Sequence, residues 1–162
     1  MLYDIEIRNY KNIMFQGAGW DGYTRDVAYH LVAQSQPYPD VCEVKEPYKN
    51  SWYDEDGDDE YTGELYRKPF EFQVKFFIKA AGGTAMDEIR AERERFLSML
   101  MEEGEFMYYD GWQQVGFMGV RFVKSSVDRT DITDMDCWMI FTVTFKVNNP
   151  ANVHPSNGKL VG

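Results

Sequence analysis

The sequence has little of what most catalytic and metal sites require. Its 162 residues include two cysteines and two histidines. Cys42, Cys137, His30 and His154 form no CxxC pair and no Cys/His cluster, which argues against a zinc site, a disulfide framework and a cysteine or histidine catalytic system. We interpret both cysteines as core residues or free thiols in apolar segments. We therefore expect no catalytic residue, no cofactor and no metal ligand.

Positive charge and long apolar runs are scarce too. The chain has 17 Lys and Arg against 27 Asp and Glu, a formal net charge of −10. The basic residues are scattered, whereas nucleic-acid binding depends on clustered cations that neutralise phosphates, so we expect no sequence-specific nucleic-acid binding. No segment is apolar for long enough to span a bilayer, and the N-terminal residues lack the apolar run of a signal peptide. These absences predict a chain that is made and folded in a cytosol.

One stretch concentrates the negative charge: WYDEDGDDEY (52–61) has six carboxylates in ten residues. An EF-hand loop needs Gly at position 6 and Glu at position 12, but counting from Asp54 these positions hold Asp59 and Leu65. We interpret the stretch as part of a solvated hairpin arm over 48–66, with a weak cation site as the alternative. The candidate arm residues are Trp52, Tyr53, Asp54, Asp56, Asp58, Asp59 and Tyr61.

Alternating apolar and polar residues predict a mainly β chain. The expected strands are Leu2–Arg8, Ile13–Phe15, Asp26–Gln34, Val41–Glu46, Phe70–Lys79, Glu105–Tyr109, Trp112–Lys124 and Cys137–Val147. Phe70–Lys79 is the clearest of these, with an apolar residue at every second position. Trp112–Lys124 is apolar on both faces (Val115, Phe117 and Val123 on one; Met118, Val120 and Phe122 on the other), which predicts that it is covered twice.

Local signals define the connections between these strands. Helical spacing predicts a helix over Ala85–Glu103, with Thr84 as N-cap and Gly104 as its stop. Asp110-Gly111 predicts a two-residue type I′ hairpin turn. The polar segment SSVDRTDITDMD (125–136) is expected to be a connector, and residues 151–162 a flexible C-terminal tail. Two acids at the end of the helix would be stabilised by a cationic partner or screened by solvent.

Five runs occur in an order that resembles a known family. They are KPFEFQVKFFIKA, RAERERFLSMLMEEG, MYYDGW, VGFMGVRFVKS and CWMIFTVTFKV, and they cover about half of the chain. This order of strand, helix, hairpin and strands resembles the N-terminal, tube-like domain of phage distal tail proteins, which are related to tail-tube subunits. The resemblance implies an α+β, mainly β fold: an antiparallel β-sandwich or split barrel flanked by one helix (about 85–103), in a single domain over 1–150.

The resemblance also implies a function. It implies a structural subunit of a phage or prophage tail that forms a homo-oligomeric ring, six-fold in this family, around a channel for DNA, with other tail proteins as partners. The protein would be made in the bacterial host cytoplasm and reside in the virion tail. Acids toward the lumen would hold DNA off the wall, and the arm would reach a neighbouring subunit or the next ring.

Two other function classes stay open at the level of sequence. A β-sandwich with exposed aromatics at Trp20, Tyr23 and Trp112 can stack sugars, so a carbohydrate- or host-surface-binding module is the alternative function. An enzyme is the second rival, because some of the many carboxylates could converge only in three dimensions. The sequence offers no catalytic motif for it.

Overall fold

The computed structural model describes residues 13–17, 21–23, 32–35, 43–46, 49–51, 58–60, 66–82, 85–111, 113–156 and 159–162. These residues form strands joined by turns and one helix, so the fold class is α+β and mainly antiparallel β, as the alternating pattern predicts. The elements are β1 (Ile13–Gln16), β2 (Asp21–Tyr23), β3 (Val32–Ser35), β4 (Lys49–Ser51), β5 (Asp58–Glu60), β6 (Phe70–Ala81), α2 (Met86–Glu103), β7 (Glu105–Asp110), β8 (Val115–Ile132), β9 (Asp136–Asn149), β10 (His154–Ser156) and β11 (Lys159–Val161).

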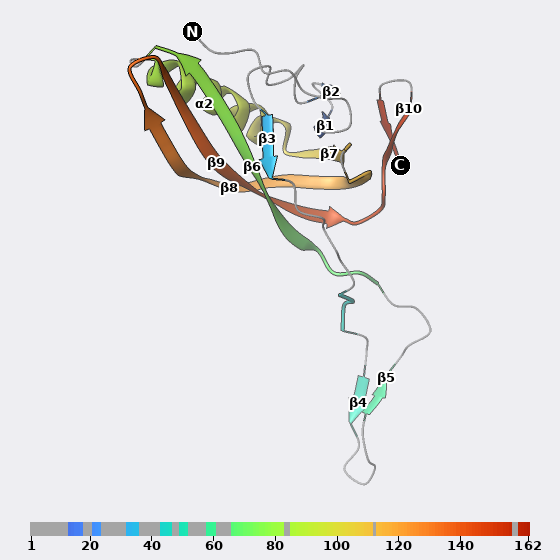
Figure 1. Cartoon of the computed structure of the whole chain (residues 1–162). Helices are drawn as coiled ribbons and strands as arrows, with labels where there is room; N and C mark the ends of the chain where they lie inside the picture. The colour runs from blue at the N-terminus through green and yellow to red at the C-terminus, as the bar shows by residue number, and fades with distance from the viewer. Residues whose placement is uncertain are drawn as a thin grey trace.

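Seven strands make one twisted antiparallel sheet in the order β2-β1-β7-β8-β9-β6-β3. β9 lies between the two longest partners: it pairs with β6 from Phe70↔Val147 to Ala81↔Asp136, and with β8 over a similar length. In Figure 1, α2 covers one face of this sheet, and the small hairpin β4–β5 stands apart from it. β8 is thus the middle strand of the seven, and β9, the last strand of the sheet in sequence, lies between β8 and β6.

The core fills the space between the sheet and α2. Alternate residues of β6 and β9 are buried there, which confirms the predicted apolar face of Phe70–Lys79. Phe15 of β1 is at the middle of an aromatic cluster, with ring centroids 5.6–5.9 Å from four other rings. The main core consists of Ile13, Phe15, Phe72, Val74, Phe76, Ile78, Ala80, Ala85, Ile89, Phe96, Leu97, Leu100, Phe106, Tyr108, Phe117, Val120, Cys137, Met139, Phe141, Val143, Phe145 and Val147.

The helix begins one residue later than predicted and ends where predicted. No side chain caps its N-terminus; the Ala85 N–H donates instead to the Gly82 carbonyl at 3.3 Å, and the predicted cap Thr84 lies outside the described residues. At the other end Gly104 has a φ of 76°, the left-handed conformation that glycine adopts without a steric cost. The last turn contains no basic residue that would offset its two terminal acids.

The segment expected to be a polar connector is a strand. β8 continues to Ile132 and pairs with β9 up to Ile132↔Cys137, so the two strands form one long hairpin. The segment is polar because pairing with β7 reaches only to Arg121, opposite the first residue of β7. Within the described part of the chain, the rest of β8 has a neighbouring strand on one side only. A strand with one open edge and one open face needs few apolar residues.

The hairpin from β7 to β8 also differs from its prediction. Asp110 pairs with Val115, so residues 111–114 form a four-residue loop and not a two-residue type I′ turn. The buried Asp110 carboxylate accepts a hydrogen bond from the Gln113 N–H at 3.1 Å, and Gln114 has a φ of 56°. The aspartate thus stabilises a longer turn than the Asp-Gly pair suggested.

Strict alternation is wrong for β8. Phe117 and Val120 both lie in the main core, although they have opposite parity, because the pairing shifts at bulges between Phe106 and Tyr108 and again between Gly119 and Val120. Met118 faces the other way and packs on a second small cluster. The prediction that both faces of this strand are covered is confirmed. α2 covers one face of this stretch, and the C-terminal residues cover the other.

The C-terminal residues, which we expected to be a loose tail, form the hairpin β10–β11. Val153 and Leu160 are buried with Met14 of β1. The Gly116 N–H donates to Asn152 Oδ1 at 3.1 Å, and a Cβ at Gly116 would lie 2.7 Å from both Val153 Cγ2 and the Tyr108 carbonyl. Glycine therefore allows the C-terminal segment to approach the sheet closely.

The remaining N-terminal expectations are tested only in part. The predicted Ile13–Phe15 strand is confirmed as β1, whereas Leu2–Arg8 lies outside the described residues. Of Asp26–Gln34, the described part is within β3. Of Val41–Glu46, the described residues 43–46 are exposed and make one isolated bridge, Val44↔Arg67, so no strand is present there.

Candidate functional site

The described residues contain no cluster of metal-ligating side chains. No group of three or more His, Cys, Asp or Glu among them could hold a metal ion, and none of their helices is both long and apolar enough to cross a membrane. Cys137 is a buried free thiol in β9, as predicted for a core residue. His154 is exposed in β10, whereas His30 and Cys42 lie outside the described residues.

The predicted arm contains a hairpin. Lys49–Ser51 pairs antiparallel with Asp58–Glu60, which places Asp58 and Asp59 in β5. At its base the two legs are held by hydrogen bonds from the Lys45 N–H to the Tyr66 carbonyl (2.7 Å) and from the Lys68 N–H to the Glu43 carbonyl (3.0 Å). The other candidate arm residues lie outside the described part of the chain: Trp52, Tyr53, Asp54, Asp56 and Tyr61.

The candidate sugar-stacking aromatics are not brought together by any described contact. Tyr23 lies in β2, where its backbone pairs with Met14 of β1. Trp20 and Trp112 lie outside the described residues. The carbohydrate-binding alternative therefore stays a hypothesis based on composition.

The most distinctive surface of the described chain is the free side of β8 from Phe122 to Ile132, which we call the open edge. β7 begins at Glu105, opposite Arg121, and beyond Arg121 no other described strand lies along this side of β8. Val127 is 45% exposed on this edge, and Ile132 and Met135 are also exposed. An unpaired strand with exposed apolar side chains is a template for pairing with another chain.

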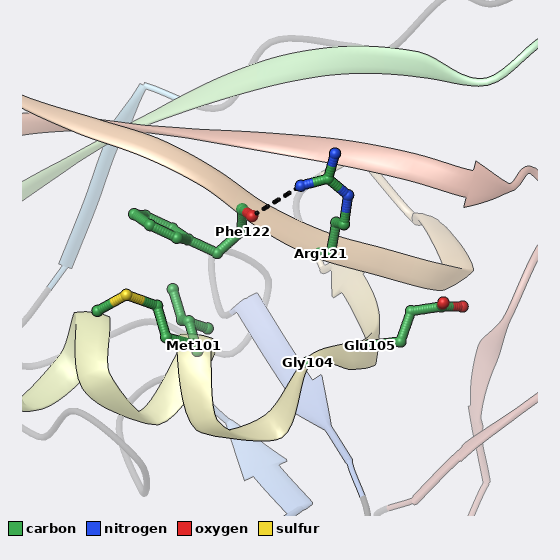
Figure 2. A pocket seen from close by; sticks show the side chains of 6 residues that line it. Met101, Gly104, Glu105, Arg121 and Phe122 are labelled. Atoms are coloured by element: carbon green, nitrogen blue, oxygen red, sulfur yellow. Dashed lines mark hydrogen bonds between the residues drawn. The ribbon is translucent and has the colours of Figure 1, made fainter.

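A cavity of about 390 Å³ lies where the open edge begins, between α2 and β8. It is lined by Leu100, Met101, Gly104, Glu105, Arg121 and Phe122. Figure 2 shows Met101 from α2 near Phe122 from β8, with the Arg121 guanidinium directed away from the helix and donating to the Phe122 carbonyl at 3.3 Å. At the beginning of the open edge, apolar side chains of this cavity (Leu100, Met101 and Phe122) therefore lie next to the charged Glu105 and Arg121.

Arg93 of α2 contacts the open edge at Ser125, three residues beyond Phe122. The Arg93 guanidinium donates to Ser125 Oγ at 2.9 Å and lies 5.3 Å from the Phe141 ring centroid. Its Nε is buried and lacks a hydrogen-bond partner. Burial lowers the pKa of Arg93, and the negative charge of Glu94 partly opposes this shift. Positive charge is thus held in a partly desolvated position beside β8.

The face of the sheet opposite α2 is polar. Thr142 and Thr144 are buried at its centre, with the Thr142 hydroxyl donating to the Asp128 carboxylate at 2.5 Å and Gln73 donating to Thr144 at 3.4 Å. Register places six cations and five acids on this face. The cations are Lys75, Lys79, Arg121, Lys124, Arg129 and Lys146, and the acids are Glu71, Glu105, Asp128, Asp131 and Asp136. The charges of the two signs are therefore nearly balanced on this face.

A buried phenol lies within the core below these surfaces. Burial raises the pKa of Tyr108 well above its ordinary value, and the nearby Asp110 carboxylate raises it further. The folded protein therefore keeps this proton at a pH where the unfolded chain loses it. We expect the free energy of unfolding to fall above pH ~10, the ordinary tyrosine pKa. In a Tyr108→Phe variant this alkaline fall should be smaller, as measured by urea unfolding from pH 8 to 11; equal slopes would contradict the prediction.

Comparisons with known proteins find a likeness in fold alone. No protein-family model matches the chain, and no curated protein matches its sequence. Among solved structures, the Dit protein of phage SPP1, a paradigm of the hub adsorption apparatus of phages that infect Gram-positive bacteria, matches 88% of this chain with a TM-score of 0.56 and 13% identity. The chain spans about half of that protein's length, since 52% of Dit is covered.

Sequence reasoning missed the open edge because it interpreted 125–136 as a connector. A weak signal was present: Val127, Thr130 and Ile132 are β-branched residues within an otherwise polar run. All three face the α2 side of the sheet, because they pair with Phe141, Met139 and Cys137 of β9. They are three and then two residues apart, and not two and two, because Asp128 bulges out of the register.

Proposed function

We propose that this protein is a structural subunit of a phage tail that forms a ring around the channel through which DNA passes, at or near the distal end of the tail. The observation that carries the proposal is the likeness of its fold to Dit over 88% of the chain. The fold includes the same order of strand, helix, hairpin and closing strands that resembles the distal tail family in sequence.

The open edge supports assembly as the role of the fold. It exposes backbone donors and acceptors along a segment of the longest strand, next to apolar side chains. A ring of subunits covers such edges by joining each sheet to its neighbour, and closure removes every free edge at once. The six-fold number comes from the family resemblance and belongs to the same proposal.

The experiment that tests this function measures assembly of the purified full chain over a range of concentrations. Light scattering gives the mass and negative-stain electron microscopy gives the shape. We expect closed rings with an open centre, or short stacks of rings. A chain that remains monomeric across the whole range would contradict the proposal for the protein on its own.

A matched pair of variants connects assembly to the open edge. Val127 on this edge and Val161 in β11 are exposed to similar extents, 45% and 40%. Val127→Asp should prevent ring formation by placing a carboxylate in the joint, whereas Val161→Asp should assemble like the wild type. Circular dichroism would verify that both variants keep their secondary structure.

A further inference from the structure

The open edge carries positive charge on both of its faces near Phe122. Arg121 and Lys124 lie on the face opposite α2, and neither has a carboxylate partner among the described residues. Arg93 lies on the α2 side, bonded to Ser125. Glu105 is the acid nearest to this group in register, opposite Arg121, but the two form no ion pair. A strand that adds to this edge would therefore meet cations above and below it.

The hairpin β4–β5 has the complementary charge. β5 consists of three consecutive acids, Asp58, Asp59 and Glu60. Because successive residues of a strand alternate between its faces, three acids in a row give a strand carboxylates on both faces whichever way it is turned. Among the described strands β4 and β5 pair only with each other, so the outer edge of each can accept a third strand.

The hairpin is placed to act between copies. In Figure 1 β4 and β5 stand away from the seven-stranded sheet, beyond the end of the sheet where β6 begins. The open edge begins at Phe122, level with Phe72 near the start of β6, and runs to the opposite end of the sheet, where β8 turns into β9. The hairpin leaves the sheet at β6, and β9 lies between β6 and β8, so the hairpin is not next to the open edge of its own chain.

We propose that the hairpin β4–β5 of one copy adds to the open edge of β8 in a second copy, with β5 beside Phe122–Ser125. Main-chain hydrogen bonds would extend the sheet across the subunit joint. Carboxylates of β5 would meet Arg121 and Lys124 on one face and Arg93 on the other, and the cavity wall at Met101 and Phe122 would cover the added strand. This inference rests on the proposed function, and it assigns the two surfaces that make the joint.

Charge reversal tests the pairing in the full-length protein. One variant combines Asp58→Lys with Asp59→Lys, and the other combines Arg121→Glu with Lys124→Glu. Each should weaken self-association about tenfold or more, which corresponds to a change of about 1.4 kcal/mol. Both changes in one chain, or a mixture of the two variant proteins, should restore association, because opposite charges then meet again. Lys146→Glu, on the same face but one strand farther from the edge, is the control that should not change it.

Cross-linking identifies the contact directly. A photoreactive phenylalanine analogue at Asn50 in β4 should form bonds to another copy within residues 118–132, as identified by peptide mass spectrometry in a mixture of tagged and untagged chains. Cross-links that stay within one chain, or that reach a different surface of the second copy, would overturn the inference.

The outcomes separate this inference from the proposed function. Rings that form equally well in both charge-reversal variants would overturn the hairpin contact and leave the ring proposal standing. Association that responds to both reversals but never closes into rings would support the contact and count against the ring. A wild-type chain that stays monomeric at every concentration would overturn both.

Discussion

Replacing Phe15 by alanine is expected to destabilise the fold by about 3–5 kcal/mol, the range for removing a fully buried aromatic ring. Phe15 is 0% exposed and contacts the rings of Phe96, Phe106, Tyr108 and Phe145. These residues come from α2, β7 and β9, so the cavity left by the ring would weaken the packing of three elements together. Chemical denaturation followed by tryptophan fluorescence and circular dichroism measures the effect.

Met135→Ala is the control for this prediction. Met135 is 79% exposed in the turn between β8 and β9, so its truncation should change the free energy of unfolding by less than about 0.5 kcal/mol. If Phe15→Ala costs no more than this control, the aromatic cluster is not the centre of the core. In that case the position of β1 in the sheet would be wrong.

Removing residues 151–162 is expected to destabilise the protein by several kcal/mol, although the sequence alone predicted a flexible tail there. The deletion takes away Val153 and Leu160, which are buried against Met14. Burying one such aliphatic side chain contributes about 1.5–3 kcal/mol, so the two together contribute roughly twice that amount. The deletion also exposes Met14 and Met118 to water. Thermal unfolding of the shortened chain measures the loss.

A point variant distinguishes this packing from an effect of chain length. Leu160 is 2% exposed, whereas its neighbour Val161 is 40% exposed on the other side of β11. Leu160→Ala should cost about 2–5 kcal/mol, and Val161→Ala should cost much less. Two equal and small effects would mean that the C-terminal hairpin does not pack on the sheet in solution, as the tail prediction supposed.

The parts of the fold that were predictable are those where a single local pattern decides the outcome. Every second residue of β6 is apolar, and that stripe is buried against α2. The helix follows from the spacing of Ile89, Phe96 and Leu100, and it ends at Gly104, where a positive φ is required. In these segments the local preference and the tertiary packing agree, so alternation and helical spacing were sufficient.

The parts that could not be predicted depend on distant contacts. Bulges in β8 move Phe117 and Val120 to the same face of the sheet. The alternation of apolar and polar residues in the sequence does not reveal where such bulges occur. The C-terminal residues read as a tail because Val153 and Leu160 are isolated apolar residues among polar ones, and their partner Met14 is far away in sequence. For the candidate site, the run of acidic residues in the sequence predicted the hairpin arm. The open edge was not predicted, because its residues are mostly polar and resemble a connector.

The position of β9 in the sheet has a consequence for synthesis. β9 pairs with β8 on one side and with β6 on the other. The seven-stranded sheet therefore cannot form completely until the ribosome has made residues 136–149. Until then β6 and α2 expose the apolar residues that later face β9. During synthesis the apolar residues of β6 and α2 are therefore exposed to solvent until β9 is made. Chaperones can bind such exposed apolar residues. Nascent chains stalled before Asp136 should be protease-sensitive throughout, and protection should arise abruptly once Asn149 has left the exit tunnel.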